Sequence, residues 1–152
     1  MLSELAVDKL KKRKKVFIQG PQTPQFIADS IAKHSTKTDI GAHNIFLGQV
    51  RSDAVDGKKV MAIEYSAYEE MAEKEFLEIR EAAFVQYDIT CLHIYHSLGR
   101  VAAGEISLFV FVSSPHRDEC YKASRFIVDE IKSKVPVFGK EIFSDNTHQW
   151  KR

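Results

Sequence analysis

The residues best suited to chemistry in this sequence are cations at the ends of predicted elements, and they favour the binding of an anion. The segment SSPHRDE, residues 113–119, joins an apolar strand to a long helix. Ser114 is a candidate cap for that helix, Pro115 suits its first position, and His116 and Arg117 fall in its first turn. Backbone N–H groups and the helix dipole favour an anion there, and these two side chains would complete a phosphate or carboxylate receptor. An ordinary helix start with a surface ion pair is the alternative interpretation.

Two further basic groups lie at the ends of elements. Arg51 ends the strand-like stretch FLGQVRSD, in which Gly48 predicts a bulge or a close approach of two backbones. Three lysines surround the predicted end of the long helix in KSKVPVFGKE, namely Lys132, Lys134 and Lys140. A solvated arginine and lysines favoured by the helix dipole are the structural alternatives, so these signals leave the function open.

Groupings for metal binding or nucleophilic catalysis are weaker. His93 and His96 are three positions apart on a predicted strand and therefore point to opposite faces, although Cys91 shares a face with His93. Cys120 falls in a helical first turn, where a thiolate would be stabilised, but its spacing from Ala123 favours a buried structural cysteine. The sequence has no glycine-rich phosphate loop and no nucleophile elbow. We therefore predict no metal site and no bound cofactor.

Length and composition place these residues in one soluble domain. The chain has 152 residues, of which 44% are apolar and 28% charged, and this balance excludes a disordered tail. The longest apolar run, 108–112, is far shorter than the roughly 20 residues of a membrane-spanning helix, and no signal peptide is visible. Two cysteines cannot build a disulfide framework and fit a reducing compartment. We predict a cytoplasmic protein that does not contact a membrane.

Charge is unevenly distributed along the chain. Residues 1–15 carry six basic side chains against Glu4 and Asp8, a net charge of +4, so the remaining 137 residues sum to −3. We interpret 1–15 as a basic leader and 16–152 as a single domain. The leader is either a solvated segment or an arm of a non-enzymatic module that binds nucleic acid or an acidic partner. The acidic body argues against a broad nucleic-acid-binding face, so any basic pocket must be local.

Three helices are predicted to position these groups. Thr23 before Pro24 starts the first helix, which ends near His34, while the second covers 68–84 and the third runs from about Pro115 to Lys134. Charged residues of the second helix, Arg80 included, are expected to face solvent. The expected inward-facing residues are Phe26, Ile27 and Ile31 in the first helix, Ala72, Phe76, Ile79 and Ala83 in the second, and Ala123, Ile127 and Ile131 in the third.

Strands are predicted at 16–19, 42–50, 59–66, 89–96 and 105–113, with two short ones around Ser144–Asn146. Asp56-Gly57 is a turn signal, and Gly99–Gly104 is expected to turn the chain. The stretch 105–113 is apolar on both faces, which is typical of a central strand covered on both sides. Strands mixed with helices without regular alternation indicate an α+β fold.

Taken in order, the motifs FLGQVRSD, SPHR after a strand, a helix ending in IKSKVP, and the tail KEIF…W resemble the large catalytic subunit of molybdopterin synthases. The resemblance runs from about residue 16 to Trp150. It implies an α/β-hammerhead-like fold with a mixed, mainly antiparallel sheet and about three helices. It also implies a homodimer of large subunits inside a heterotetramer, with a small ubiquitin-like sulfur-carrier subunit at each end.

The same resemblance implies a reaction. Members of the family convert cyclic pyranopterin monophosphate (precursor Z) into molybdopterin by inserting two sulfurs as a dithiolene, and each sulfur arrives as a thiocarboxylate on the C-terminal glycine of the small subunit. Carried over by position, Lys132 and Lys140 are the catalytic residues, with Lys132 as acid–base or as stabiliser of an oxyanion. The substrate pocket would comprise Gln49, Val50, Arg51, His116, Arg117, Lys132, Gly139, Lys140 and Glu141, and apolar Phe46, Val128 and Phe138 would wall the groove for the carrier's tail.

One departure and one distance qualify this assignment. Many members have two basic residues after the aromatic residue that follows the helix, whereas this chain has Phe138-Gly139-Lys140. We expect Gly139 to let Lys140 turn inward, the alternative being a pseudo-enzyme that keeps only the partner-binding groove. Arg117 and Lys132 are 15 residues apart on one predicted helix, or roughly 22 Å. If both line one pocket, His116 and Arg117 must come from the neighbouring protomer.

Overall fold

A computed structural model of the chain describes residues 15–151, so the predicted leader lies outside the described residues except for Lys15. The helices in this part of the chain are α2 (Pro24–Lys33), α3 (Glu69–Gln86) and α4 (Arg117–Lys134). The strands are β1 (Phe17–Gln19), β2 (Ala42–Gln49), β3 (Ala54–Val55), β4 (Lys58–Ala67), β5 (Cys91–Ala102), β6 (Ile106–Ser114), β7 (Val137–Phe143) and β8 (His148–Trp150). None of these helices is long and apolar enough to cross a membrane.

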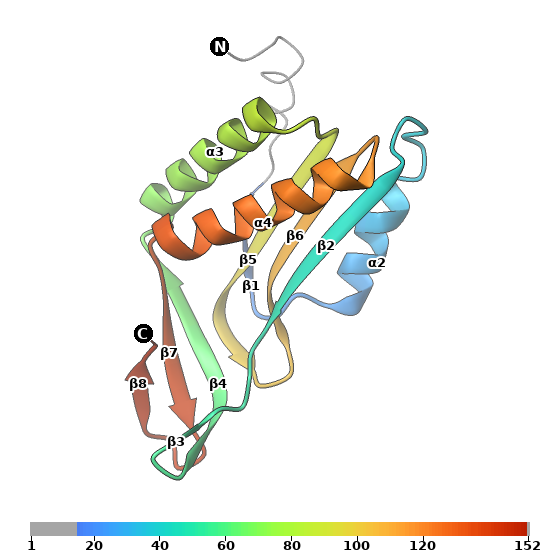
Figure 1. The fold of residues 1–152 in the computed structure, drawn as a ribbon. Helices are drawn as coiled ribbons and strands as arrows, with labels where there is room; N and C mark the ends of the chain where they lie inside the picture. The colour runs from blue at the N-terminus through green and yellow to red at the C-terminus, as the bar shows by residue number, and fades with distance from the viewer. Residues whose placement is uncertain (1–14, 152) are drawn as a thin grey trace.

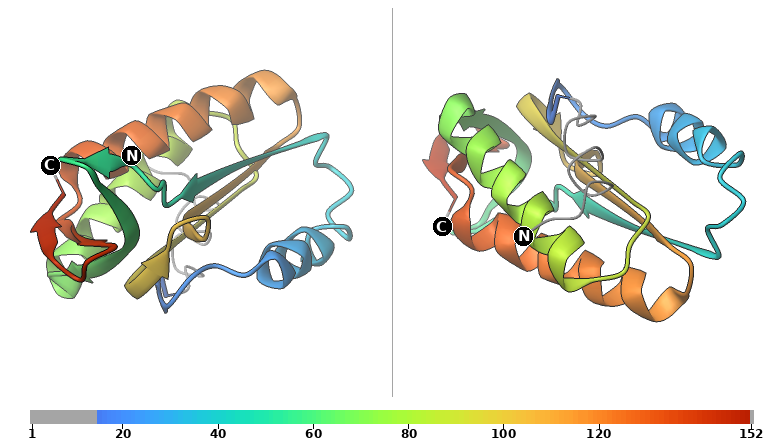
Figure 2. Two further views of the ribbon diagram at one scale, coloured as in Figure 1. Left: turned by 90° about the horizontal axis from the view of Figure 1, so that it is seen from below. Right: turned by 90° about the horizontal axis from the view of Figure 1, so that it is seen from above.

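The strands form one open sheet in the order β2-β6-β5-β4-β7-β8. All pairs along this path are antiparallel, while β1 joins β5 in parallel and β3 pairs with β4. Helices α3 and α4 cover one face of the sheet and α2 covers the other (Figures 1 and 2). The predicted α+β class and the mixed, mainly antiparallel sheet with about three helices are confirmed.

Strand β6 is the centre of the fold, as its doubly apolar sequence predicts. All its residues after Ile106 are buried. Its even-numbered residues, such as Val110, join the core formed with α3 and α4. Phe109 and Phe111 point to the opposite face, where Phe109 meets Phe26 of α2 edge to face at 6.0 Å. The hydrophobic core therefore lies in two layers, one on each side of the strand.

The packing of the helices differs from prediction at two residues. The predicted stripe of α3 is buried, but Arg80 is buried beside it because its guanidinium donates a hydrogen bond to the carbonyl of Leu92 on β5. In α2, Thr23 caps the helix as predicted, through a 3.1 Å bond from the Phe26 N–H. Ile31 is nevertheless 43% exposed, and α2 contains no fully buried residue. Helix α2 is thus held to the sheet by only partly buried side chains.

The observed ends of two elements also differ from the predicted ones. Strand β5 continues through Gly99 to Ala102, because β1 and β4 supply hydrogen-bonding partners for its second half and its apolar residues Leu98 and Val101 are buried. Helix α4 begins at Arg117, with His116 in extended geometry at the N-cap position. Ser114 therefore ends β6 and does not cap the helix, since its hydroxyl donates to the His116 carbonyl at 2.5 Å.

Candidate functional site

A cavity of about 290 Å³ lies where the end of β2, the last turn of α4 and the strands β4 and β7 meet. This volume is close to the roughly 300 Å³ at which small-molecule pockets begin. Residues from six segments line it, so the pocket exists only in the folded chain. Five of the nine predicted site residues are among the lining residues: Gln49, Val50, Arg51, Lys132 and Glu141.

The end of β2 is shaped by Gly48, as predicted. The pairing register with β6 shifts between Gly48 and Gln49, and a Cβ added at Gly48 would lie 3.2 Å from the Leu108 Cβ. A bulge and a close backbone approach therefore coincide here. Beyond the bulge Val50 is buried, and its N–H donates to the Glu105 carbonyl at 3.0 Å. Arg51 follows at the rim, exposed and paired with Asp53 at 3.2 Å.

Two lysines bring positive charge to the pocket. Lys132 comes from the last turn of α4, and Lys151 comes from the segment after β8. Burial against the protein lowers the pKa of the Lys132 amine, and the positive charge of Lys151 lowers it further. A lysine with a lowered pKa is a free amine more of the time at neutral pH than an ordinary lysine.

Behind these cations lies a polar wall built by Tyr65 and Ser107. The Tyr65 hydroxyl donates to the Ser107 hydroxyl at 3.2 Å, which in turn donates to the Gly48 carbonyl at 3.3 Å. Burial raises the pKa of Tyr65, so the phenol stays protonated. His96 packs edge to face on Tyr65, and burial followed by the charge of Lys132 lowers its pKa to about 4. The wall is therefore neutral, and the charge in the pocket comes from residues around it.

The structure corrects the expectation for Lys140. Side chains alternate along β7, so Gly139 and Glu141 face the pocket and Lys140 faces away. Its ammonium lies 3.7 Å from Glu64 on β4. A Cβ at Gly139 would lie only 2.9 Å from Ile63 and 3.6 Å from the Lys151 Cβ. The Lys151 N–H donates to the Gly139 carbonyl at 2.7 Å, so Lys151 is the lysine next to the glycine position.

The residues not predicted from the sequence include Tyr65, Ser107 and Lys151, which line the pocket, and His96, which packs on Tyr65. A signal for Lys151 was present, because a hairpin centred on residue 145 places residue 151 opposite residue 139. Tyr65 falls within the predicted strand 59–66, and no feature of the sequence gives it a function. His96 was considered only as a metal ligand.

His116 and Arg117 do not line this pocket. They lie at the start of α4, whereas Lys132 lies at its other end (Figure 1). Because α4 is one continuous helix, the predicted separation of roughly 22 Å between Arg117 and Lys132 applies. Within one chain, His116 and Arg117 therefore lie far from the pocket that contains Lys132.

Comparison with known proteins assigns the family. The model of the MoaE protein family matches residues 22–134, about three quarters of the chain. The chain belongs to the MoaE family. The relatives include the molybdopterin synthase catalytic subunits of Pyrococcus abyssi, which is 40% identical over 82% of each chain, and of Rattus norvegicus, which is 38% identical. The chain spans 56% of the rat protein and about 31% of the Drosophila proteins that it matches.

Solved structures of similar chains share the fold. Molybdopterin synthase from Staphylococcus aureus is 31% identical, with a TM-score of 0.77 over 90% of this chain and 96% of that one. A Helicobacter pylori complex of subunits 1 and 2 of molybdopterin-converting factor contains a chain with the same fold at 19% identity and a TM-score of 0.76. The fold implied by the sequence motifs is therefore the one observed in this MoaE chain.

Proposed function

We propose that this MoaE chain is the catalytic subunit of a molybdopterin synthase. It would transfer sulfur from the thiocarboxylated C-terminal glycine of a small ubiquitin-like subunit to precursor Z, in the cytoplasm, and so form the dithiolene of molybdopterin. The observation that carries the proposal is the single pocket that collects Arg51, Lys132 and Lys151 from distant parts of the sequence. A phosphorylated pterin needs such a receptor.

The charges of the pocket support binding of a phosphate. Arg51 is paired with Asp53, which holds its guanidinium at the rim. Within residues 15–151, no carboxylate lies within 4.0 Å of the ammonium groups of Lys132 and Lys151. These two lysines are therefore available to an anionic substrate, and Gln49 offers an uncharged amide beside them.

Lys132 is the group best placed for the chemistry. Once the carrier's sulfur is bonded to a carbon of the substrate, the two are joined as a thioester. Water must then add to the thioester carbonyl and break its C–S bond, which releases the carrier as a carboxylate and leaves the sulfur on the pterin. As a free amine, Lys132 would accept a proton from this water, and as an ammonium it would stabilise the oxyanion that forms. Its lowered pKa makes both forms accessible closer to neutral pH than in an ordinary lysine.

A shallow groove beside the pocket supports the expected docking of the carrier's tail. Phe46 lines both the pocket and this groove, and Val128 lines the groove from α4. An extended peptide lying there would reach the pocket past Phe46. Phe138, the third predicted wall residue, lies elsewhere, in a hollow with Tyr68 and Trp150.

Reconstitution tests the proposal directly. The full-length chain, mixed with precursor Z and its cognate thiocarboxylated small subunit, should form molybdopterin, which is measured by fluorescence after oxidation. A chain lacking residues 1–14 should keep this activity, because the pocket lies wholly in the described domain. Lack of product from the full-length chain would leave the pseudo-enzyme interpretation. Salt-sensitive binding of nucleic acid that disappears with the arm would favour the alternative of a binding module, for which the comparisons offer no support.

Replacement of Lys151 by glutamine should raise the pKa of the Lys132 amine. The substitution removes the repulsive charge of Lys151 while desolvation remains, so this pKa rises but stays below that of an ordinary lysine. The pH dependence of Lys132 acylation, followed by mass spectrometry, should therefore shift to higher pH, and KM for precursor Z should increase. Lys140→Gln is the matched control because Lys140 faces Glu64. An equal shift in both variants would contradict the assignment.

A further inference from the structure

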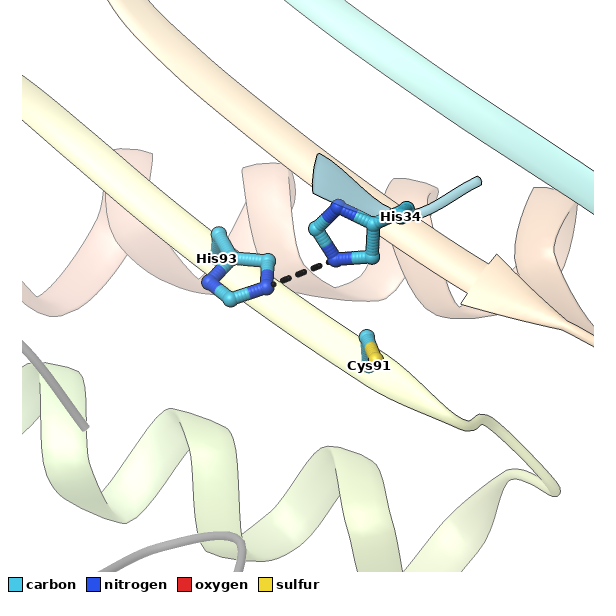
Figure 3. A group of neighbouring side chains, drawn as sticks. All are labelled: His34, Cys91 and His93. Carbon is cyan, nitrogen blue, oxygen red and sulfur yellow. Dashed lines mark hydrogen bonds between the residues drawn. The ribbon is translucent and has the colours of Figure 1, made fainter. Parts of the chain in front are cut away.

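On the opposite face of the sheet, at the end of α2, two imidazoles and a thiol face one another. His34 is the C-cap residue of α2, and Cys91 and His93 lie two positions apart on β5. Their possible ligand atoms all lie within 4.8 Å of one another. Figure 3 shows the rings of His34 and His93 facing each other, with Cys91 further along the strand that carries His93. This cluster takes no part in the pocket described above.

The hydrogen bonds of His34 orient it as a metal ligand. Its Nδ1 lies 2.8 Å from the Ser30 carbonyl, and because a carbonyl can only accept, Nδ1 carries the hydrogen. In the neutral ring Nε2 therefore presents a lone pair, and it lies 3.0 Å from Nε2 of His93. Metal-binding histidines are commonly held by such a bond from the other nitrogen to a backbone carbonyl. Stacking on Phe111 at 4.7 Å fixes the ring further.

Cys91 brings a sulfur ligand to this cluster. Cys91 is buried, and the Lys37 ammonium donates to its sulfur at 3.0 Å. The position beside the sulfur therefore already accommodates a positive charge. Lys37 is an exposed side chain, so it can withdraw into solvent when a metal takes its place.

We propose that His34, Cys91 and His93 bind a zinc ion that fastens α2 to the sheet. A Cys/His₂ set suits Zn²⁺, with Zn–N distances of about 2.0–2.1 Å and Zn–S of about 2.3 Å. The sulfur must approach the imidazoles by about 1 Å to reach these distances. On binding, the thiol releases one proton, and the hydrogen between the two imidazoles moves from Nε2 to Nδ1 of His93. The fourth position is left to water.

The proposal also explains how α2 can stay docked. This helix has no fully buried residue, so apolar packing alone holds it weakly. A metal bound to the folded protein adds its binding free energy to stability by mass action. The sequence predicts no metal site because His93 and His96 point to opposite faces of one strand. His34 reaches Cys91 and His93 only through the packing of α2, a tertiary contact that the sequence pattern does not indicate.

Cobalt binding to the full-length chain tests this proposal independently of sulfur transfer. The chain, stripped with a chelator, should bind one Co²⁺ with a sulfur-to-metal charge-transfer band that one equivalent of Zn²⁺ abolishes. Cys91→Ser should lose the band, whereas Cys120→Ser, which removes the other buried thiol, should keep it. Zinc should also slow hydrogen exchange in residues 24–34.

A second variant keeps the test decisive if Cys91→Ser does not fold. His93→Gln retains the thiol and should weaken cobalt binding by at least about tenfold, which is the loss that even outer-shell changes can cause. Absence of the charge-transfer band in the wild type, its persistence in Cys91→Ser, its equal loss in Cys120→Ser, or unchanged affinity in His93→Gln would each overturn the zinc site.

Discussion

Replacing Lys132 with alanine is expected to lower the rate of molybdopterin formation by about 10²–10⁴-fold, the usual contribution of a positioned acid–base group. Lys132 is the lysine that α4 places in the pocket, and its pKa is already lowered by burial and by Lys151. Single-turnover measurements with saturating precursor Z and thiocarboxylated small subunit would separate this loss from weaker substrate binding.

Lys134→Ala is the matched control for this experiment. Lys134 lies on the same helical turn, but its exposed ammonium pairs with Glu130 at 2.7 Å and does not line the pocket. Because an exposed ion pair contributes little to stability, the control should keep the wild-type rate within about twofold. Comparable losses in both variants would mean that the end of α4, and not the amine of Lys132, is required.

Mixing two inactive variants should restore activity if the site is shared between protomers. In a dimer of one Arg117→Ala chain and one Lys132→Ala chain, one of the two sites keeps both cations when they come from different chains. Random reassociation makes half of the dimers mixed, so activity should recover to about a quarter of the wild-type value. The measurement is molybdopterin formation after the two variants have been unfolded together, refolded and supplied with the small subunit.

A second mixture tests whether recovery requires two residues that come from different chains. Arg51 and Lys132 line the same pocket in one chain, so every site in an Arg51→Ala and Lys132→Ala dimer carries one defect. This pair should recover nothing beyond the single variants. If the Arg117→Ala mixture also fails to recover, Arg117 does not act across a dimer, and the role assigned to the start of α4 would have to be abandoned.

The sequence predicts local geometry well where one strong preference acts. Thr23-Pro24 starts a helix, Asp56-Gly57 forms a turn with both φ angles positive, and the stripe of α3 that contains Phe76 is buried. In each of these places the local structure is determined by residues that are close together in the sequence. The family motifs also predict part of the pocket. Gln49–Arg51 and Lys132 lie at the ends of elements that the fold brings together.

Predictions fail where a distant segment decides the outcome. Arg80 is buried because the Leu92 carbonyl on another element accepts its hydrogen bond, and β5 extends past His96 because β1 and β4 are there to pair with it. Lys140 is the predicted lysine because it follows Gly139 in sequence, whereas Lys151 lies next to Gly139 only across a hairpin and is not predicted. Each failure is a tertiary contact that outweighs a local preference.

The order of the strands has a consequence for how the protein folds. Strand β4 pairs with β7, so Tyr65 lies opposite Gly139 although more than half the length of the domain separates them in sequence. Strand β1 likewise pairs with β5, which is formed from a much later part of the chain. Such a topology has a high contact order, which slows folding because long loops must close before their contacts can form. During synthesis on the ribosome, the cavity would remain open on one side until the last hairpin leaves the exit tunnel, so nascent chains would acquire their ligand-binding capacity last.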